Sequence, residues 1–182
     1  MYFMISPLPG TSAVPLTGDV GATGPCRTPT GRLRGDRSPI GRHDGPVRGR
    51  TQADESTPRA SRHDYWGVVL EAPDASALAR FYSDLLGWEV ASDGPNFATV
   101  GPPDGVAYLG FQTSPEYERP VWPPEPGSQQ MMMHLDFEVS DLEAAVADAV
   151  ELGAREAKYQ PQDTVRVLLD PVGHPFCLYR DA

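Results

Sequence analysis

The chain has 182 residues, a hydrophobic content of 40% and a formal net charge of −10. No apolar run approaches the roughly 18 residues that a membrane span needs, so a membrane protein is not expected. The first residues, MYFMISPLPGTSAVPL, contain neither a basic segment nor a long apolar stretch, and we expect no secretory signal. With only two cysteines, Cys26 and Cys177, a disulfide framework is not expected, and we predict a cytoplasmic protein.

The charge is distributed unevenly along the chain. Residues 1–64 hold nine arginines, no lysine and six acidic residues, which gives +3. Residues 65–182 hold six basic and nineteen acidic residues, which gives −13. A domain with that charge repels nucleic acid and anionic membranes, so we expect neither as a partner.

Residues 1–64 are rich in glycine and proline, and their arginines follow no period, as in GRLRGDRSPIGRHDGPVRGR. Such a segment cannot bury enough apolar surface to offset its chain entropy, so we expect a disordered leader. Two other interpretations stay open. One is an RNA-binding arm, although the aromatic residues that such arms interleave with arginine are missing. The other is a true start codon further downstream, which would make part of the leader a mis-assigned start.

Residues 65–113 predict a first unit of one helix and four strands. The segment WGVVLEA is apolar and β-branched and predicts a strand. Asp74 then suits the N-cap of a helix that starts near Ala75 and ends at Gly87. Three strands follow, at WEVAS, NFATV and VAYLGFQT, separated by glycine and proline turns. The predicted apolar face of the helix consists of Leu78, Phe81, Tyr82, Leu85 and Leu86.

Residues 131–180 predict a second unit in the same order, after a proline-rich loop over 114–130. A strand within MMMHLDFEVS comes first, Asp141 suits the N-cap of the second helix, and Gly153 follows its end. Short strands are predicted near REAK, TVRVLL and PFCLY. The apolar face of this helix consists of Leu142, Ala145, Val146, Ala149 and Leu152.

The two units are an internal repeat with an offset of 67 residues, which places LEAPD over FEVSD. Each unit has one amphipathic helix to cover one face of its strands. We therefore predict an α+β fold, in which two tandem βαβββ modules form a curved eight-stranded mixed sheet. The helices lie outside, and the concave face is free for a ligand.

Three segments, APDASALARFYSDLLGWEV, HLDFEVSDLEAAVADAVELGA and DPVGHPFCLY, resemble the vicinal oxygen chelate (VOC) superfamily. This superfamily includes glyoxalase I, extradiol dioxygenases and bleomycin-resistance proteins, and the likeness is strongest to glyoxalase-like domains. The resemblance covers about residues 65–180, within a predicted domain over residues 65–182, and implies the glyoxalase/bleomycin-resistance fold. It does not by itself supply a reaction.

The resemblance also implies where a divalent metal would bind. Metal-dependent members take one ligand from the first and one from the last strand of each unit. Here these positions hold His134, its repeat partner Gly67, Cys177, and a strand whose nearest candidates are Leu109, Gly110 and Gln112. Three of the four expected ligands are absent, so we predict no metal cofactor, while a divalent metal stays open as the alternative.

His134 is the residue to which we tentatively give a catalytic role. His134, Asp136 and Glu138 share one side of their strand, which predicts a polar ligand pocket with His134 as hydrogen-bond donor or general base. A locally satisfied structural histidine is an equally good interpretation. The other predicted ligand-binding residues are Tyr108, Gln112, Trp122 in the loop, and Cys177.

Three functions follow from these residues. The first is binding of a small organic molecule in the concave sheet without the usual metal, as in drug-sequestering resistance proteins. The second is a lyase, isomerase or dioxygenase-type enzyme with a non-standard site around His134. The third is a non-catalytic module that forms a homodimer. The acidic lining at Asp136 and Glu138 favours neutral or cationic ligands.

Overall fold

The computed structural model describes Arg50 and residues 56–180. The expected disorder of residues 1–49 and 51–55 lies outside the described residues. A short 3₁₀ helix, η1 (Arg59–Ser61), precedes the first strand. The hydroxyl of Tyr65 donates to the Arg59 carbonyl at 2.6 Å, and the buried carboxylate of Asp64 is 2.5 Å from the Arg62 guanidinium. Contacts of the folded region therefore begin upstream of Tyr65.

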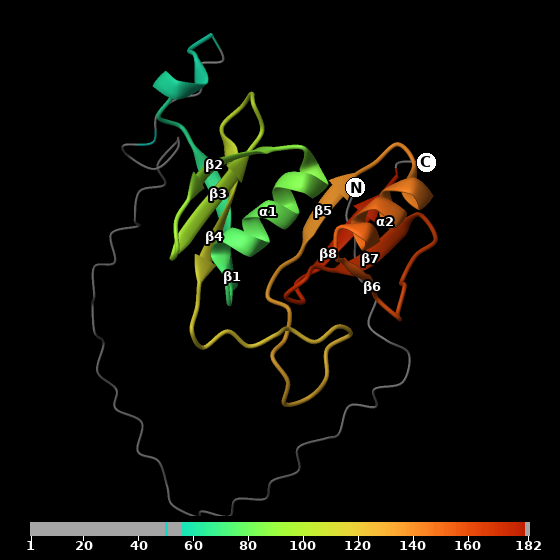
Figure 1. Ribbon diagram of the computed structural model, residues 1–182. Coiled ribbons are helices and arrows are strands. Elements are labelled where there is room, and N and C mark those ends of the chain that lie inside the picture. Colours follow the sequence, from blue (N-terminus) through green and yellow to red (C-terminus); the bar gives the residue numbers. More distant parts are fainter. Residues whose placement is uncertain (1–49, 51–55, 181–182) are drawn as a thin grey trace, which may run out of the picture. The chain divides into compact units, whose positions relative to one another are not determined.

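The first module contains the strands β1 (Trp66–Ala72), β2 (Glu89–Asp93), β3 (Phe97–Gly101) and β4 (Ala107–Thr113), and the helix α1 (Ala75–Leu86). Its strands form one sheet in the order β1-β4-β3-β2, with β1 and β4 parallel. Figure 1 shows α1 lying against this sheet.

The second module repeats this arrangement with β5 (Leu135–Glu138), α2 (Leu142–Glu151), β6 (Arg155–Glu156), β7 (Val165–Leu169) and β8 (Pro175–Tyr179). Its sheet has the corresponding order β5-β8-β7-β6, with β5 and β8 parallel, and α2 lies against it (Figure 1). Neither α1 nor α2 has the length and apolar character that a bilayer crossing requires, and the described residues contain no other helix that does.

The α+β class and the paired βαβββ modules are confirmed. The strands form two hydrogen-bonded sheets of four, where we had expected one sheet of eight. The 67-residue offset of the repeat is also found between the register partners of the two parallel strand pairs. Val68 faces Leu109 in the first module, and Leu135 faces Phe176 in the second. Positions offset by 67 residues on these four strands are therefore structurally equivalent.

Both predicted helix N-caps are confirmed. The carboxylate of Asp74 accepts a hydrogen bond from the Ala77 amide at 3.0 Å, and Asp141 does the same for Ala144. Each bond satisfies one of the amides that the first turn of a helix leaves unpaired. Gly87 follows α1 with a φ of 63°, a left-handed conformation that favours glycine.

Aromatic side chains from both modules form a shared core. Tyr82 of α1 is fully buried and stacks on Phe111 of β4 with ring centroids 5.4 Å apart. The same ring is 6.4 Å from Phe137 of β5 and 6.3 Å from Phe176 of β8. Because one helix of the first module contacts strands of the second, the two modules are packed as one hydrophobic unit.

Strand β5 is shorter than the sequence suggested, since residues 131–134 precede it without ladder pairing. The neighbouring strand β8 begins at Pro175, and the register places that proline opposite His134. Proline has no N–H to donate to a ladder, which accounts for the late start of pairing. Residues 131–134 are thereby left free of the ladder.

Candidate functional site

Each sheet has a free face opposite its helices, and alternation along the strands decides which residues lie on it. In β4, Leu109 and Phe111 are buried against α1. Tyr108, Gly110 and Gln112 therefore lie on the free face of the first sheet. In the second module, Asp136 of β5 and Cys177 of β8 are register partners on the corresponding face.

The free face of the first module is closed at the positions equivalent to His134 and Cys177. These positions are Gly67 and Gly110. A Cβ atom at Gly67 would be 2.6 Å from the Tyr108 ring, and one at Gly110 would be 3.0 Å from the Phe97 ring. Aromatic rings fill the space that ligand side chains would need.

The free face of the second module instead brings three predicted residues together. His134 Nε2 is 3.2 Å from Asp136 Oδ1. One donor atom from each of His134, Asp136 and Cys177 lies within 4.8 Å of the others. The side chains of His134 and Asp136 are 26% and 38% exposed, so solvent reaches the cluster.

Cys177 is a protonated thiol in this environment. Burial raises the pKa of its thiol to about 12, and the charge of Asp136 and a hydrogen bond to that carboxylate add to the effect. A thiol with such a pKa is a poor nucleophile near neutral pH. Covalent chemistry through Cys177 is therefore disfavoured as long as the proton stays on sulfur.

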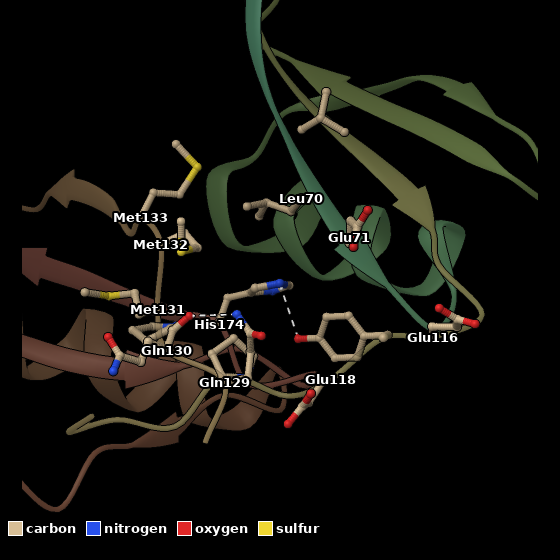
Figure 2. A pocket seen from close by; sticks show the side chains of 14 residues that line it. Leu70, Glu71, Glu116, Glu118, Gln129, Gln130, Met131, Met132, Met133 and His174 are labelled. Carbon is tan, nitrogen blue, oxygen red and sulfur yellow. Dashed lines mark hydrogen bonds between the residues drawn. The ribbon is translucent and has the colours of Figure 1, made fainter. Parts of the chain in front are cut away.

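A separate cavity of about 340 Å³ lies where β1 meets the loop before β5 and the turn before β8. Figure 2 shows His174 in the middle of this pocket, with the methionines on one side and Glu71 on the other. Met132 and Met133 are 89% and 50% exposed. The lining residues are Val69, Leu70, Glu71, Glu116, Tyr117, Glu118, Pro120, Gln129, Gln130, Met131, Met132, Met133, His174 and Pro175.

A chain of hydrogen bonds fixes the His174 ring. Asp170 is fully buried, and its Oδ1 accepts from the backbone amides of Val172, Gly173 and His174 at 2.7–3.0 Å. His174 Nδ1 is 2.8 Å from Asp170 Oδ2, and its Nε2 is 3.3 Å from the Tyr117 hydroxyl, the contact drawn as a dashed line from His174 in Figure 2. A carboxylate that holds one ring nitrogen orients an imidazole for proton exchange at the other.

Two tyrosines beside this chain stay neutral. Burial, and then the charge of Asp170, raises the pKa of the Tyr117 hydroxyl, while Arg119 acts in the opposite direction. Burial is also the largest cause of the raised pKa of Tyr82, followed by the charge of Asp170. Tyr117 donates to the Val172 carbonyl at 3.1 Å and Tyr82 to Asp170 at 3.2 Å, so both act as hydrogen-bond donors.

The loop before β5 is attached to the turn before β8 by two side chains. Tyr117 reaches the turn as described, and the Arg119 guanidinium donates to the Pro171 carbonyl at 3.1 Å. A Cβ at Gly173 would be 2.5 Å from Arg119, so glycine permits this approach. Trp122 belongs to the same loop but does not line the pocket, and its buried Nε1 has no hydrogen-bond partner among the described residues.

The remaining predicted residues, Tyr108, Gln112 and Trp122, do not line the pocket. Tyr108 lines a second cavity of about 350 Å³ on the first sheet, together with Arg59, Phe97 and others. Gln112 is exposed and pairs in register with Glu71. The structure therefore groups His134, Asp136 and Cys177, and Tyr108, Gln112 and Trp122 are not members of that cluster.

The sequence did not predict the residues that form the pocket. Tyr117 lies in the segment predicted only as a proline-rich loop, and neither Asp170 nor His174 is among the predicted site residues. Their contacts join positions 57 residues apart, which no periodicity reports. One signal in the sequence could have indicated this site. His174 directly follows the DPVG turn and precedes the last predicted strand, which was expected to border a ligand site.

The metal site of metal-dependent VOC proteins does not fit this chain. It takes ligands from both modules, and here the first module offers Gly67 and Gly110 under aromatic rings.

Two βαβββ modules, each with a helix on one face of its sheet and the other face free of helices, define the glyoxalase/bleomycin-resistance class of folds. The family model described as a glyoxalase-like domain matches residues 67–179. The chain therefore belongs to the glyoxalase-like domain family of the VOC superfamily. A comparison with curated proteins gives no match.

Solved structures with a similar fold come from several bacteria. A glyoxalase/bleomycin resistance protein/dioxygenase family enzyme from Burkholderia phytofirmans PsJN is 19% identical, with a TM-score of 0.49, over 63% of this chain and 95% of that one. A lactoylglutathione lyase from Agrobacterium tumefaciens is 17% identical, with a TM-score of 0.44, over 63% and 90%. A glyoxalase family protein from Enterococcus faecalis is 23% identical, with a TM-score of 0.44, over 65% and 97%.

Proposed function

We propose that this glyoxalase-like domain binds a small organic molecule in the pocket of Figure 2, without the two-module metal site of its superfamily. The observation that carries the proposal is the pocket itself. Its volume of about 340 Å³ lies within the range of ligand sites, roughly 300–1,000 Å³. Val69 and Glu71 reach it from the free face of the first sheet.

The lining supports a ligand with an apolar body. Val69 is 44% exposed, and the neighbouring methionines also present apolar surface to solvent. Methionine side chains are flexible and polarisable and adapt to ligands of different shapes. The few polar groups, among them His174 and Tyr117, are held by hydrogen bonds and can fix the orientation of a ligand.

The charge of the lining favours neutral or cationic ligands. Glu71, Glu116 and Glu118 contribute carboxylates, and none of the described lining residues is lysine or arginine. The domain as a whole carries a net charge of −13, from six basic and nineteen acidic residues over 65–182. An anion would meet repulsion both at the pocket and on approach.

The test is a fragment screen that includes a matched set of benzamidine, benzamide and benzoate. These molecules share shape and differ in charge. We expect binding of the cation, weaker binding of the amide and none of benzoate by isothermal titration calorimetry. Val69→Trp should abolish binding because it fills the cavity from an exposed position.

A matched variant controls for the added tryptophan. Val90 is 40% exposed on β2 and does not line the pocket, so Val90→Trp should bind like the unchanged protein. A screen in which no fragment binds at millimolar concentration would contradict the proposal. Equal binding by Val69→Trp and the unchanged protein would contradict it as well.

A second candidate function is favoured by the cluster of His134, Asp136 and Cys177. A histidine 3.2 Å from a carboxylate on a solvent-accessible face can act as a general base, which suits a lyase- or isomerase-type reaction. If a substrate is found, His134→Ala should lower kcat by about a hundredfold or more. Unchanged turnover in that variant would exclude this candidate.

A further inference from the structure

Three consecutive methionines line the pocket of Figure 2, and two of them are open to solvent. Met131, Met132 and Met133 all border the cavity and lie on the same side of His174. Met132 is 89% exposed and Met133 is 50% exposed. Methionine is among the residues most often buried in proteins. Core packing therefore does not account for two thioethers that face both solvent and a cavity.

We propose that Met132 and Met133 are oxidation sites, and that their conversion to methionine sulfoxide by a peroxide weakens ligand binding in the pocket. The part of this inference that concerns binding rests on the proposed function. The change is reversible, because dedicated reductases return both epimers of methionine sulfoxide to methionine. The pocket thus binds its ligand more tightly under reducing conditions than under oxidising ones.

The oxidation uses one molecule of hydrogen peroxide and no catalytic group of the protein. A lone pair of the thioether sulfur attacks one peroxide oxygen, a sulfur–oxygen bond forms, and the O–O bond breaks. The departing hydroxide takes the proton from the oxygen now on sulfur and becomes water. Sulfur loses two electrons and the peroxide gains two. Access of the oxidant to sulfur is the requirement, which the exposure of Met132 and Met133 meets.

Oxidation at these positions leaves the fold intact. Residues 131–134 precede β5 and are not paired in its ladder. None of the three methionines is part of the hydrophobic core cluster that the described residues form. A sulfoxide disrupts packing when it forms inside a core. Here the new polar group meets the pocket and solvent, so its effect is expected on ligand binding and not on stability.

The sulfoxide changes the wall that meets the apolar body of a ligand. The thioether is apolar and flexible, whereas the sulfoxide is polar. An apolar ring that covers a sulfoxide oxygen removes its water without offering a hydrogen bond, which costs free energy. The methionines supply much of the apolar wall, since the other apolar lining residues are Val69, Leu70, Pro120 and Pro175.

Oxidation of exposed thioethers without any effect on the pocket is the competing interpretation. It predicts sulfoxides at the same two residues but an unchanged affinity for ligands. Cys177 is a poor alternative target for peroxide, because burial raises the pKa of its thiol and keeps the reactive thiolate scarce. The affinity before and after oxidation therefore separates the two interpretations.

The experiment treats the full chain with hydrogen peroxide, removes the peroxide, and titrates the protein with benzamidine by calorimetry. Peptide mass spectrometry should locate sulfoxides at Met132 and Met133. The dissociation constant for benzamidine should rise about fivefold or more, because the ring now covers a polar group. The two methionine sulfoxide reductases, supplied with dithiothreitol, should restore the first value, and dithiothreitol alone should not.

Matched variants assign the effect to the two residues. Leucine has a similar volume and contains no sulfur, so the double variant Met132→Leu/Met133→Leu should have the same affinity before and after peroxide. Met4→Leu changes a methionine outside the described residues, and Cys26→Ser changes the second cysteine. Both should respond to peroxide as the unchanged protein does. Circular dichroism establishes that each variant is folded, and Met132→Leu alone replaces the double variant if that one is not.

Three outcomes would overturn this inference alone. One is the absence of sulfoxide at both residues under peroxide that oxidises free methionine. Another is an unchanged affinity for benzamidine after both residues are oxidised. The third is an equal loss of affinity in the double variant. In each case benzamidine still binds the untreated protein, so the proposed function stands. If benzamidine does not bind the untreated protein, the proposed function and this inference fail together.

Discussion

The two modules have the same strand order and the same register, yet their free faces differ in chemistry. In the first module, aromatic rings cover Gly67 and Gly110. The equivalent residues of the second module are His134 and Cys177, whose side chains lie close to that of Asp136. The repeat fixes the backbone positions, and the side chains at those positions decide what each face can bind. The same fold therefore has aromatic rings over these positions in one module and polar side chains at them in the other.

The turns before the last strands show a second difference. In the second module Asp170 is buried and accepts hydrogen bonds from three amides, His174 and Tyr82. In the first module the turn GPPDGV has no histidine, and its Asp104 is exposed. The buried carboxylate that holds a histidine is therefore found at the second of these two turns and not at the first.

The largest expected effect concerns Cys177, on the free face of the second module. With a pKa of about 12, the Cys177 thiol should be alkylated by iodoacetamide at pH 8 about a hundredfold more slowly than a free cysteine, whose pKa is about 8.5, because its smaller thiolate fraction outweighs the higher nucleophilicity of that thiolate. Asp136→Asn should speed the reaction, because the carboxylate is the next cause of the raised pKa after burial. Peptide mass spectrometry measures both rates. Alkylation of Cys177 at the rate of a free cysteine would contradict the raised pKa of its thiol.

The next effect sharpens the contrast between the turns. Asp170→Ala should lower the free energy of unfolding by about 3–5 kcal/mol, because several buried donors lose their acceptor. Asp104→Ala, at an exposed position, should change it by less than about 0.5 kcal/mol. Urea unfolding measures both. Similar losses in the two variants would show that the turns are equivalent.

A substitution at Gly67 tests whether the first face is closed. Gly67→Ala should destabilise the protein by about 1–3 kcal/mol, because the new Cβ meets the Tyr108 ring. An open strand position would give the opposite sign, since alanine in a strand is normally better than glycine. When Tyr108 is also replaced by alanine, Gly67→Ala should lower the free energy of unfolding much less. Urea unfolding of the unchanged protein, the two single variants and the double variant measures this double-mutant cycle. A stabilising Gly67→Ala would argue for an open face.

The smallest effect concerns pH and the tyrosine shared by the two modules. The folded protein raises the pKa of Tyr82 above its ordinary value near 10, so its phenol proton is held in the folded state and lost from the unfolded chain. The resulting stability is complete below about pH 10 and is lost as the pH rises further. In Tyr82→Phe, the fall in stability above pH 10 should be shallower by up to about 1.4 kcal/mol per pH unit. If the free energy of unfolding, measured with urea, falls equally steeply with pH in both proteins, the raised pKa of Tyr82 is contradicted.

Local patterns predicted most of the fold and part of the site. The caps at Asp74 and Asp141 and the strand positions follow from short-range chemistry that a sequence displays directly. Alternation along β5 predicted that His134 and Asp136 share a face, and the position of Cys177 on the last strand placed it nearby. These inferences need only strand geometry.

The pocket could not be predicted in the same way. It depends on how the loop before β5 folds back onto a turn more than fifty residues later, through Tyr117 and Arg119. Such contacts have no period and no fixed spacing. Ladder pairing starts only after the position opposite Pro175, so the three methionines line the pocket, where a longer β5 would have placed them in the sheet.

Ligand binding in the pocket is tested most directly by methyl NMR of the methionines. The chain has five methionines, three of which are Met131, Met132 and Met133. With ¹³C-labelled methionine methyl groups and benzamidine as the probe, we predict saturable shifts of these three resonances. The shifts should be absent in Val69→Trp and retained in Val90→Trp. Unchanged methyl resonances at saturating benzamidine, or equal shifts in Val69→Trp, would contradict binding at this site.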